Sequence, residues 1–212
     1  MKLLVLVAML LTTTSLRAAD GDVFTAQTAE GVTMTFKVIS ESLKTCQVGG
    51  NYGTGTAIPN DTQGRVTIPQ KAKNYKVTTI TYSAFNNCKY LEEIIIPEGV
   101  TTIESNAFMS CKKLGNVTFP ESLTKIGHQT FGFCSNITSV FIPKNVTEIG
   151  NGGYDMGSSY TGCEKLTTIT VSSENPIFDS RDNCNAIVET ASNKLITGCG
   201  STIIPNSIST IG

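Results

Sequence analysis

Two adjacent stretches decide the fold of this chain: LEEIIIPEGVTTIESNAFMSC, from Leu91 to Cys111, and LGNVTFPESLTKIGHQTFGFC, from Leu114 to Cys134. They align without a gap and match at their large apolar positions. A 23-residue interval separates Phe85, Phe108 and Phe131, and also Cys88, Cys111 and Cys134. Self-similarity at a fixed period of roughly 20–50 residues is typical of solenoids, in which each repeat forms one coil.

One repeat reads L-x-x-I-x-I-P-x-x-V-x-x-I-x-x-x-A-F-x-x-C. Within I-x-I-P, the period of two turns Ile94 and Ile96 to the interior of a short strand and Ile95 outward. Pro97 ends the strand because it lacks a backbone N–H. The segment A-F-x-x-C suits a short helical or 3₁₀ turn. The sequence therefore predicts a mainly β solenoid, with a parallel sheet on one face and short helical or 3₁₀ turns on the other.

The first residues read as an export signal. Lys2 precedes the apolar run Leu3–Leu11, and Arg17-Ala18-Ala19 fits a cleavage site, so residues 1–19 are predicted to be a signal peptide. A buried N-terminal helix is the alternative. The apolar run is shorter than the roughly 20 residues of a membrane span, and no later segment is longer. We expect a secreted or cell-surface protein.

The remaining chain divides into a cap and a solenoid. Residues 20–64 are predicted to form an N-terminal β-hairpin cap, because apolar residues alternate from Val32 to Val38 and Cys46–Val48 suits a partner strand. Residues 49–64 are expected to be a loop. The solenoid covers residues 65–212, with a loop insertion near 151–158 and a hairpin insertion near 172–198.

These repeats resemble the leucine-rich-repeat superfamily, in particular its BspA-like (Treponema-type) subclass as found in secreted Bacteroidetes proteins. The marks of that subclass are the I-P after the strand and the A-F-x-x-C on the far side, over about residues 65–212. The resemblance implies a leucine-rich-repeat solenoid that is exported and non-catalytic, in a family that includes adhesins. It implies no particular ligand, because the family is defined by its buried positions.

Charge and chemistry exclude several functions. The 16 Lys and Arg balance 17 Asp and Glu without a basic cluster, so nucleic acid is not an expected partner. The one histidine, His128, falls at a position we expect to be exposed, which leaves little basis for a catalytic set. The chain has no C-x-x-C. We expect no enzyme activity, no cofactor and no metal.

The seven cysteines favour burial over a disulfide framework. Cys88, Cys111, Cys134 and Cys163 hold one position in successive repeats, which predicts a buried column of thiols. Cys184 and Cys199 form the one candidate disulfide, since the hairpin between them could bring them together.

The outward side of the parallel sheet is the candidate binding face, and an extracellular or surface protein, such as a matrix protein or glycoprotein, is the expected partner. Two interpretations are open: a recognition patch, or residues present because they favour strands. Asn116 suits packing on the sheet face rather than glycosylation. Tyr154 is a second candidate, in the insertion, while Tyr160 is expected to replace the buried Phe. The face comprises Thr67, Glu93, Ile95, Asn116, Thr118, Ser139, Phe141, Thr168, Thr170 and Ile203.

The leading functional hypothesis is thus an exported, non-catalytic, adhesin-like interaction module. The alternative is a structural spacer of a larger surface protein without a ligand of its own. That alternative predicts a further domain after Gly212, where the sequence stops within a repeat.

Overall fold

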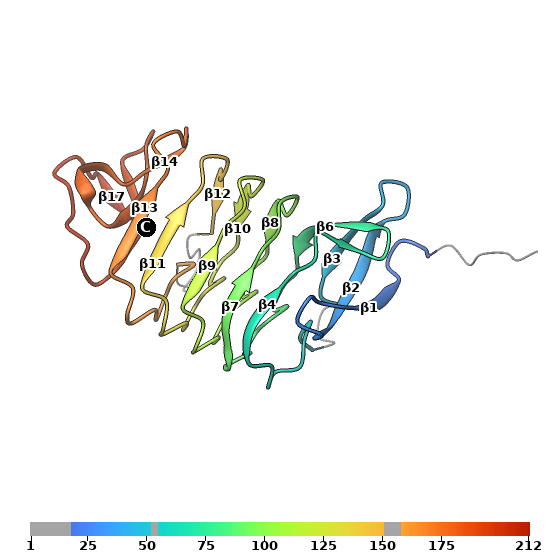
Figure 1. Ribbon diagram of the computed structural model, residues 1–212. Helices are drawn as coiled ribbons and strands as arrows, with labels where there is room; N and C mark the ends of the chain where they lie inside the picture. Colours follow the sequence, from blue (N-terminus) through green and yellow to red (C-terminus); the bar gives the residue numbers. More distant parts are fainter. Residues whose placement is uncertain (1–17, 52–54, 151–157) are drawn as a thin grey trace, which may run out of the picture.

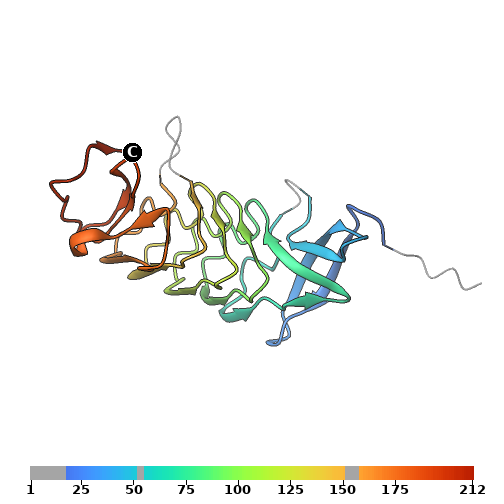
Figure 2. The same cartoon turned by 90° about the horizontal axis from the view of Figure 1, so that it is seen from above.

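The computed structural model describes residues 18–51, 55–150 and 158–212, with Asn116 described only at its backbone. The expected signal peptide, the insertion near 151–158 and Tyr154 lie wholly or largely outside these residues. The described chain winds into stacked coils with three walls, flanked by a sheet at each end (Figure 1 and Figure 2).

The first wall carries the strand of each repeat. β4 (Gly64–Thr67), β7 (Leu91–Ile95) and β9 (Asn116–Thr118) form one parallel sheet, and β11 (Ser139–Ile142) and β13 (Thr168–Val171) form a parallel pair beyond it. Ile94 faces the interior and is 1% exposed, as the period of two predicts. This wall confirms the expected parallel sheet.

The second wall is also a parallel ladder. It contains β6 (Tyr75–Ile80), β8 (Thr102–Ile103), β10 (Lys125–Ile126) and β12 (Glu148–Ile149), while β5 (Lys71–Ala72) pairs antiparallel with β6. Ile80, Ile103 and Ile126 align in register and point inward. The coils that carry β7 and β9 are therefore joined by strand ladders on two walls, through β7–β9 and β8–β10.

The third wall differs from the expectation, because it contains no helical or 3₁₀ turns at the A-F-x-x-C segments of the described coils. Successive hydrogen-bonded turns replace them, because Ser83 and Asn87 have φ of 55° and 62°, a left-handed conformation that no right-handed helix contains. Ser110 and Phe133 repeat this conformation, with φ of 62° and 60°. Backbone N–H groups of one coil donate to carbonyls of the next, as from Phe85 to Ala107 at 2.7 Å. The turn wall thus forms a third ladder.

The core consists of columns of equivalent side chains from successive coils, most of them apolar. The rings of Phe85 and Phe108 stack with centroids 4.9 Å apart, and those of Phe108 and Phe131 with centroids 5.2 Å apart. Tyr160 continues the stack on Phe131 at 5.6 Å and is 4% exposed, as expected for a residue that replaces Phe. Because each coil packs only on its neighbours, stability is a nearest-neighbour sum.

Three strands, rather than two, precede the solenoid. These strands form an antiparallel sheet in the order β1 (Val23–Gln27), β2 (Thr33–Ser40) and β3 (Thr45–Val48). β3 also pairs in parallel with β6. The N-terminal sheet therefore continues the second wall. Within the stretch expected to be a loop, Ala57 and Ile58 are buried, and the Ala57 N–H donates to the carbonyl of Ala84 at 2.5 Å. This segment acts as a partial coil beneath the first full one.

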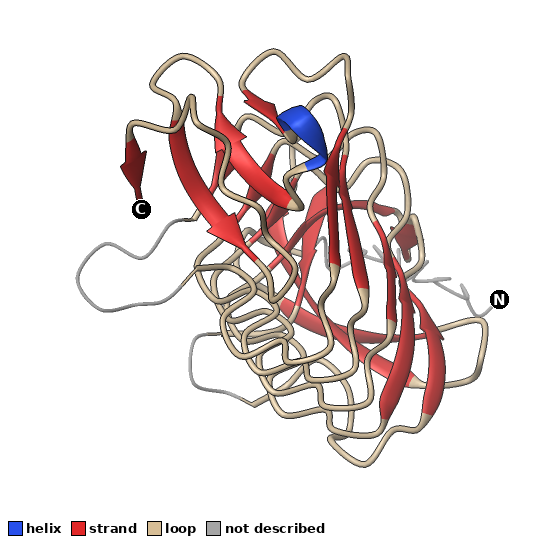
Figure 3. Cartoon of the chain, turned by 90° about the vertical axis from the view of Figure 1, so that its left-hand side faces the viewer, coloured by secondary structure: helices blue, strands red, loops and turns tan. Residues whose placement is uncertain are grey.

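The C-terminal part forms a separate sheet, seen in front of the coils in Figure 3. β15 (Ala186–Glu189) and β16 (Lys194–Gly198) pair antiparallel as a hairpin. β14 (Phe178–Asp179) joins β15, and β17 (Thr210–Ile211) joins β16 in parallel. The one helical element among the described residues is the 3₁₀ turn η1 (Arg181–Asn183).

Candidate binding faces

The outward side of β4, β7, β9, β11 and β13, which we call the sheet face, brings most of the expected residues together. Thr67, Ile95 and Thr118 are aligned in one ladder. Phe141 lies beside Thr170 in the next pair of strands, and its side chain is 53% exposed. An aromatic ring that is half exposed among hydroxyl groups can anchor a partner by burying its apolar surface.

The flanking column is polar and partly paired. Arg65 aligns with Glu93, and their side chains form an ion pair with 3.8 Å between Nε and Oε2. Ser139 and Thr168 are aligned and exposed. Asn116 occupies the expected strand position, but its side chain lies outside the described residues. Exposed ion pairs of this kind contribute little to stability.

One end of the sheet face is covered by a residue that the sequence did not single out. The carboxylate of Glu30 accepts hydrogen bonds from the backbone N–H of Thr67 at 3.0 Å and from its hydroxyl at 2.6 Å. Burial is the largest single influence and would raise the pKa of Glu30, but the hydrogen bonds from Thr67, from the backbone of Glu30 itself and from Thr28 together outweigh it and lower that pKa to about 2. Thr67 is therefore less available to a partner than Ile95 or Phe141.

Ile203 does not join the sheet face as expected. It is 73% exposed, but residues 200–209 form no strand, and its N–H donates to the carbonyl of Cys184 at 3.0 Å. The β15–β16 hairpin is inserted between β13 and this segment, so the Ile-Ile-Pro there resembles the repeat pattern without continuing its ladder.

Cys88, Cys111 and Cys134 of the cysteine column are buried as expected, whereas Cys163 is half-buried, and the column also makes hydrogen bonds. The thiol of Cys111 donates to the carbonyl of Phe85 at 3.0 Å, and that of Cys134 to Phe108 at 3.0 Å. Burial raises the pKa of Cys88 to about 12. The thiols of Cys111 and Cys134 link successive coils, and a thiol with a raised pKa, such as that of Cys88, is a poor nucleophile.

The disulfide expected between Cys184 and Cys199 is not formed, because both residues are free thiols. Each thiol is directed to a different backbone carbonyl: Cys184 contacts Ala186 at 3.8 Å, and Cys199 contacts Asn185 at 3.4 Å. The hairpin brings the two residues into the same part of the fold without joining their sulfur atoms.

His128 is half-buried rather than exposed, which corrects the expectation from the sequence. Its Nδ1 is buried and has no hydrogen-bond partner among the described residues. In the same part of the chain, no three His, Cys, Asp or Glu residues gather as a metal site would require, and no helix is long and apolar enough to cross a membrane.

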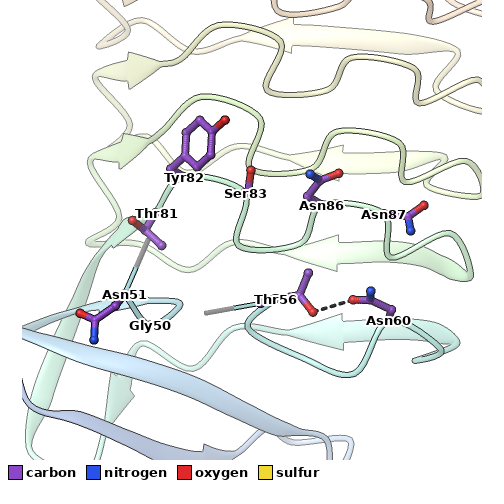
Figure 4. Close-up of a pocket in the computed structure, with 10 residues that line it drawn as sticks. Gly50, Asn51, Thr56, Asn60, Thr81, Tyr82, Ser83, Asn86 and Asn87 are labelled. Carbon is purple, nitrogen blue, oxygen red and sulfur yellow. Dashed lines mark hydrogen bonds between the residues drawn. The ribbon is translucent and has the colours of Figure 1, made fainter. Parts of the chain in front are cut away.

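A hollow that the sequence reasoning missed lies on the turn wall, at the junction of the partial coil and the first full coil (Figure 4). Its volume is about 490 Å³, and uncharged residues line it. The sequence feature that could have indicated this hollow is a departure from the repeat. Asn86-Asn87 occupy the positions at which the following coil has Met109-Ser110. Its main side chains are Thr56, Asn60, Thr81, Tyr82, Asn86 and Asn87.

Stacked coils with a parallel strand wall, an Ile-Pro strand end and a buried Phe and Cys column define a leucine-rich-repeat solenoid. Residues 64–185 match the family described as BspA type leucine rich repeat region, in six copies, and the chain belongs to that family. The resemblance drawn from the sequence is thereby confirmed. Leucine-rich-repeat proteins are protein-interaction modules and are typically non-catalytic. No curated protein shows significant similarity to the sequence.

Solved structures share the fold at low identity. A leucine-rich repeat protein from T. pallidum is 18% identical with a TM-score of 0.50, over 89% of this chain and 82% of that chain. One from Eubacterium ventriosum is 20% identical with a TM-score of 0.50, over 90% of this chain and 56% of that chain. The pneumococcal vaccine antigen PcpA is 16% identical with a TM-score of 0.54, over 92% of this chain and 62% of that chain. The chain spans less than two thirds of the last two.

Proposed function

We propose that this chain is an exported, adhesin-like module that binds an extracellular or surface protein through the sheet face. The observation that carries the proposal is the exposure of Phe141, at 53%, on β11, where its neighbour in the ladder is Thr170. Strand propensity favours an aromatic residue at position 141. Packing in the protein's own core does not account for Phe141, because its side chain faces outward. Exposed aromatic residues are enriched among the side chains that dominate protein interfaces.

The shape of the face supports the same function. Parallel strands lie about 4.8 Å apart, so five of them present a surface on the order of 20 Å long. The strand ladders within β4–β7–β9 and β11–β13, the second-wall ladder and the hydrogen bonds of the turn wall restrain this surface. A rigid surface loses little conformational entropy on binding, which favours affinity. Solenoids commonly bind partners on such extended surfaces.

Export rests on the sequence and on the kind of protein that shares the fold. The residues Lys2, Leu3–Leu11 and Arg17-Ala18-Ala19 have the order of a signal peptide. The pneumococcal vaccine antigen PcpA has the same fold. We infer a secreted or surface location, which surface proteolysis of intact cells and immunodetection in the medium would test. Protein found only inside the cells would contradict it.

The binding experiment uses immobilised fibronectin, fibrinogen and mucin as representatives of matrix proteins and glycoproteins. We expect the chain to bind at least one of them, and Phe141→Ala to weaken that binding. Binding that Phe141→Ala leaves unchanged would remove the sheet face as the site. Absence of binding to all three would overturn the adhesin-like proposal in favour of a spacer without its own ligand.

A further inference from the structure

The strand wall of the solenoid is divided at one place. β4, β7 and β9 form one parallel sheet, β11 and β13 form another, and among the described residues no strand pairing joins β9 to β11. Figure 1 shows these two strands side by side, and we call the boundary between them the seam. The facing edges of β9 and β11 therefore lack the ladder that β7 and β9 form with each other.

The two coils that meet at the seam stay joined on the other two walls. On the second wall, β10 pairs in parallel with β12. On the turn wall, the N–H of Phe131 donates to the carbonyl of Ser159 at 2.9 Å. Two walls thus hold these coils together while the strand wall does not. This is the geometry of a hinge, in which a small rotation about the paired walls separates the unpaired edges.

Phe119 is the residue that distinguishes the seam. It occupies the last inward position before the proline, where the neighbouring coils have Ile96 and Ile142. The two isoleucines are 5% and 0% exposed, whereas Phe119 is only partly buried. Its ring meets that of Phe131 edge to face, with centroids 5.7 Å apart and 60° between the ring planes. A side chain larger than its site accepts displaces the backbone around it.

Packing behind the seam is incomplete. A void too narrow for a water molecule lies there, and Val117, Phe119, Val140 and Tyr160 are among the residues that line it. The hydroxyl group of Tyr160 is buried and has no hydrogen-bond partner among the described residues. Side chains that border a void have already lost part of their dispersion contacts. Opening the strand wall at this point therefore gives up less packing than opening a filled interior would.

Two side-chain amides bridge the ends of the seam. The Nδ2 of Asn136 donates to the carbonyl of Lys113 at 3.3 Å, before the strands begin. The Nδ2 of Asn145 donates to the carbonyl of Glu121 at 2.8 Å, after the strands end. Both bonds are exposed, so water competes for the same groups and each bond can break at small cost. The seam is thus closed by two exchangeable bonds rather than by a ladder.

We propose that the seam is a joint of the solenoid, at which the strand wall opens and closes while the other two walls stay paired. Phe119 is the wedge that keeps a ladder from forming between β9 and β11. The joint divides the sheet face into two parts, each held by its own ladder. Phe141 lies on β11, so its position relative to Thr118 on β9 changes as the joint opens. The joint belongs to the fold and does not depend on binding at the sheet face.

The test is the rate at which a thiol placed behind the seam is alkylated by iodoacetamide in the folded chain. Val140→Cys places it there, because Val140 lines the void and is 6% exposed. Ile94→Cys is the matched control, since Ile94 holds the equivalent position on β7, which is paired on both sides. Mass spectrometry of the digested chain separates the new thiol from the native cysteines.

A second pair of variants tests the wedge. Phe119→Ile, made in the Val140→Cys chain, gives the seam the residue that Ile96 and Ile142 show the fold to accept. Phe24→Ile in the same chain is its control, because Phe24 is also partly buried but lies in the N-terminal sheet. Thermal melting of each variant shows whether it folds.

We expect the thiol of Val140→Cys to react at least about tenfold faster than that of Ile94→Cys. Phe119→Ile should slow this reaction toward the rate of Ile94→Cys, and Phe24→Ile should leave it unchanged. Equal rates for the two cysteine variants, or a rate that Phe119→Ile does not lower, would overturn the proposal.

Amide hydrogen exchange of the unmodified chain decides the matter if a cysteine variant does not fold. Successive residues of a strand direct their N–H groups to opposite neighbours, so alternate amides of β9 and β11 face the seam. We expect those amides to exchange faster than any amide of β7. Equal protection of β7, β9 and β11 would show that no joint exists.

Discussion

The thiol of Cys111 donates a hydrogen bond to the backbone carbonyl of Phe85, one coil earlier, with 3.0 Å between sulfur and oxygen. Cys134 repeats this contact with Phe108 at 3.0 Å, and Cys163 repeats it with Phe131 at 3.1 Å. The cysteine of each coil is therefore both a small core residue and a donor to the coil before it. This explains why an odd number of cysteines fits the fold without disulfides.

The first prediction concerns the reactivity of these thiols. We expect Cys88, Cys111 and Cys134 to resist alkylation by iodoacetamide in the native protein at neutral pH, because they are fully buried. All seven cysteines should be alkylated in denaturant without a reductant. Mass spectrometry of the labelled chain measures both. A disulfide between Cys184 and Cys199, or fast native labelling of the column, would contradict the account.

The second prediction is a loss of stability in alkali. Burial raises the pKa of Cys46 and Cys88 from 9.0 to about 12, so the native thiols stay protonated while the unfolded ones ionise. Their stabilising effect is complete below pH 9 and is lost as the pH rises toward 12. At pH 10 each thiol lowers the free energy of unfolding by about 1.4 kcal/mol. Urea unfolding from pH 8 to 10 measures this loss. The double variant Cys46→Ala with Cys88→Ala should reduce the dependence on pH without abolishing it, because burial also raises the pKa of Cys163.

A third prediction follows from the hydroxyl group of Tyr160. That group is buried and has no hydrogen-bond partner among the described residues, although the ring stacks on Phe131. Tyr160→Phe should raise the free energy of unfolding by about 1–2 kcal/mol, because it removes an unsatisfied polar group and keeps the ring. Phe131→Ala should lower it by about 3–5 kcal/mol. A destabilising Tyr160→Phe would show that the hydroxyl has a partner.

The fourth prediction tests the close approach of two coils at Gly127. A Cβ atom there would lie 2.4 Å from the backbone nitrogen of Ser105 and 2.6 Å from the carbonyl carbon of Glu104. Neither atom can move without disturbing the second wall, so Gly127→Ala should destabilise the protein by about 2–3 kcal/mol. Gly200→Ala is the control, since nothing lies within 4 Å of its Cβ position. Equal effects of the two variants would argue against the stacking described here.

The buried half of the fold could be predicted from the sequence, because the 23-residue period places a side chain of similar character at the same position in successive coils. The strands at Ile94 and Val140 and the column of Phe85 and its equivalents follow directly from it. Turn geometry could not be predicted in this way. Ser83 and Phe133 adopt positive φ because the ladder between coils constrains their backbone, and their residue types give no sign of it.

The errors at the C-terminal end and in the candidate sites have a common physical cause. Ile203 lies in a good local copy of the strand pattern, but whether a strand forms depends on a neighbouring strand that the inserted hairpin displaces. Glu30 reaches Thr67 across 37 residues of sequence, a contact that no local pattern encodes. Exposed positions carry no periodic constraint, so the hollow around Tyr82 becomes visible only when two coils are placed together.

The most direct test of the central claim is the affinity of Phe141→Thr for the matrix protein or mucin that the wild-type chain binds. Threonine is already present at the equivalent positions Thr118 and Thr170, so the fold accepts the change. Phe133→Asn is the control, because Phe133 is 45% exposed on the turn wall and Asn87 holds the equivalent position. We predict that Phe141→Thr weakens binding at least tenfold, about 1.4 kcal/mol, with no change for Phe133→Asn. Equal affinity of wild type and Phe141→Thr would contradict recognition through the sheet face.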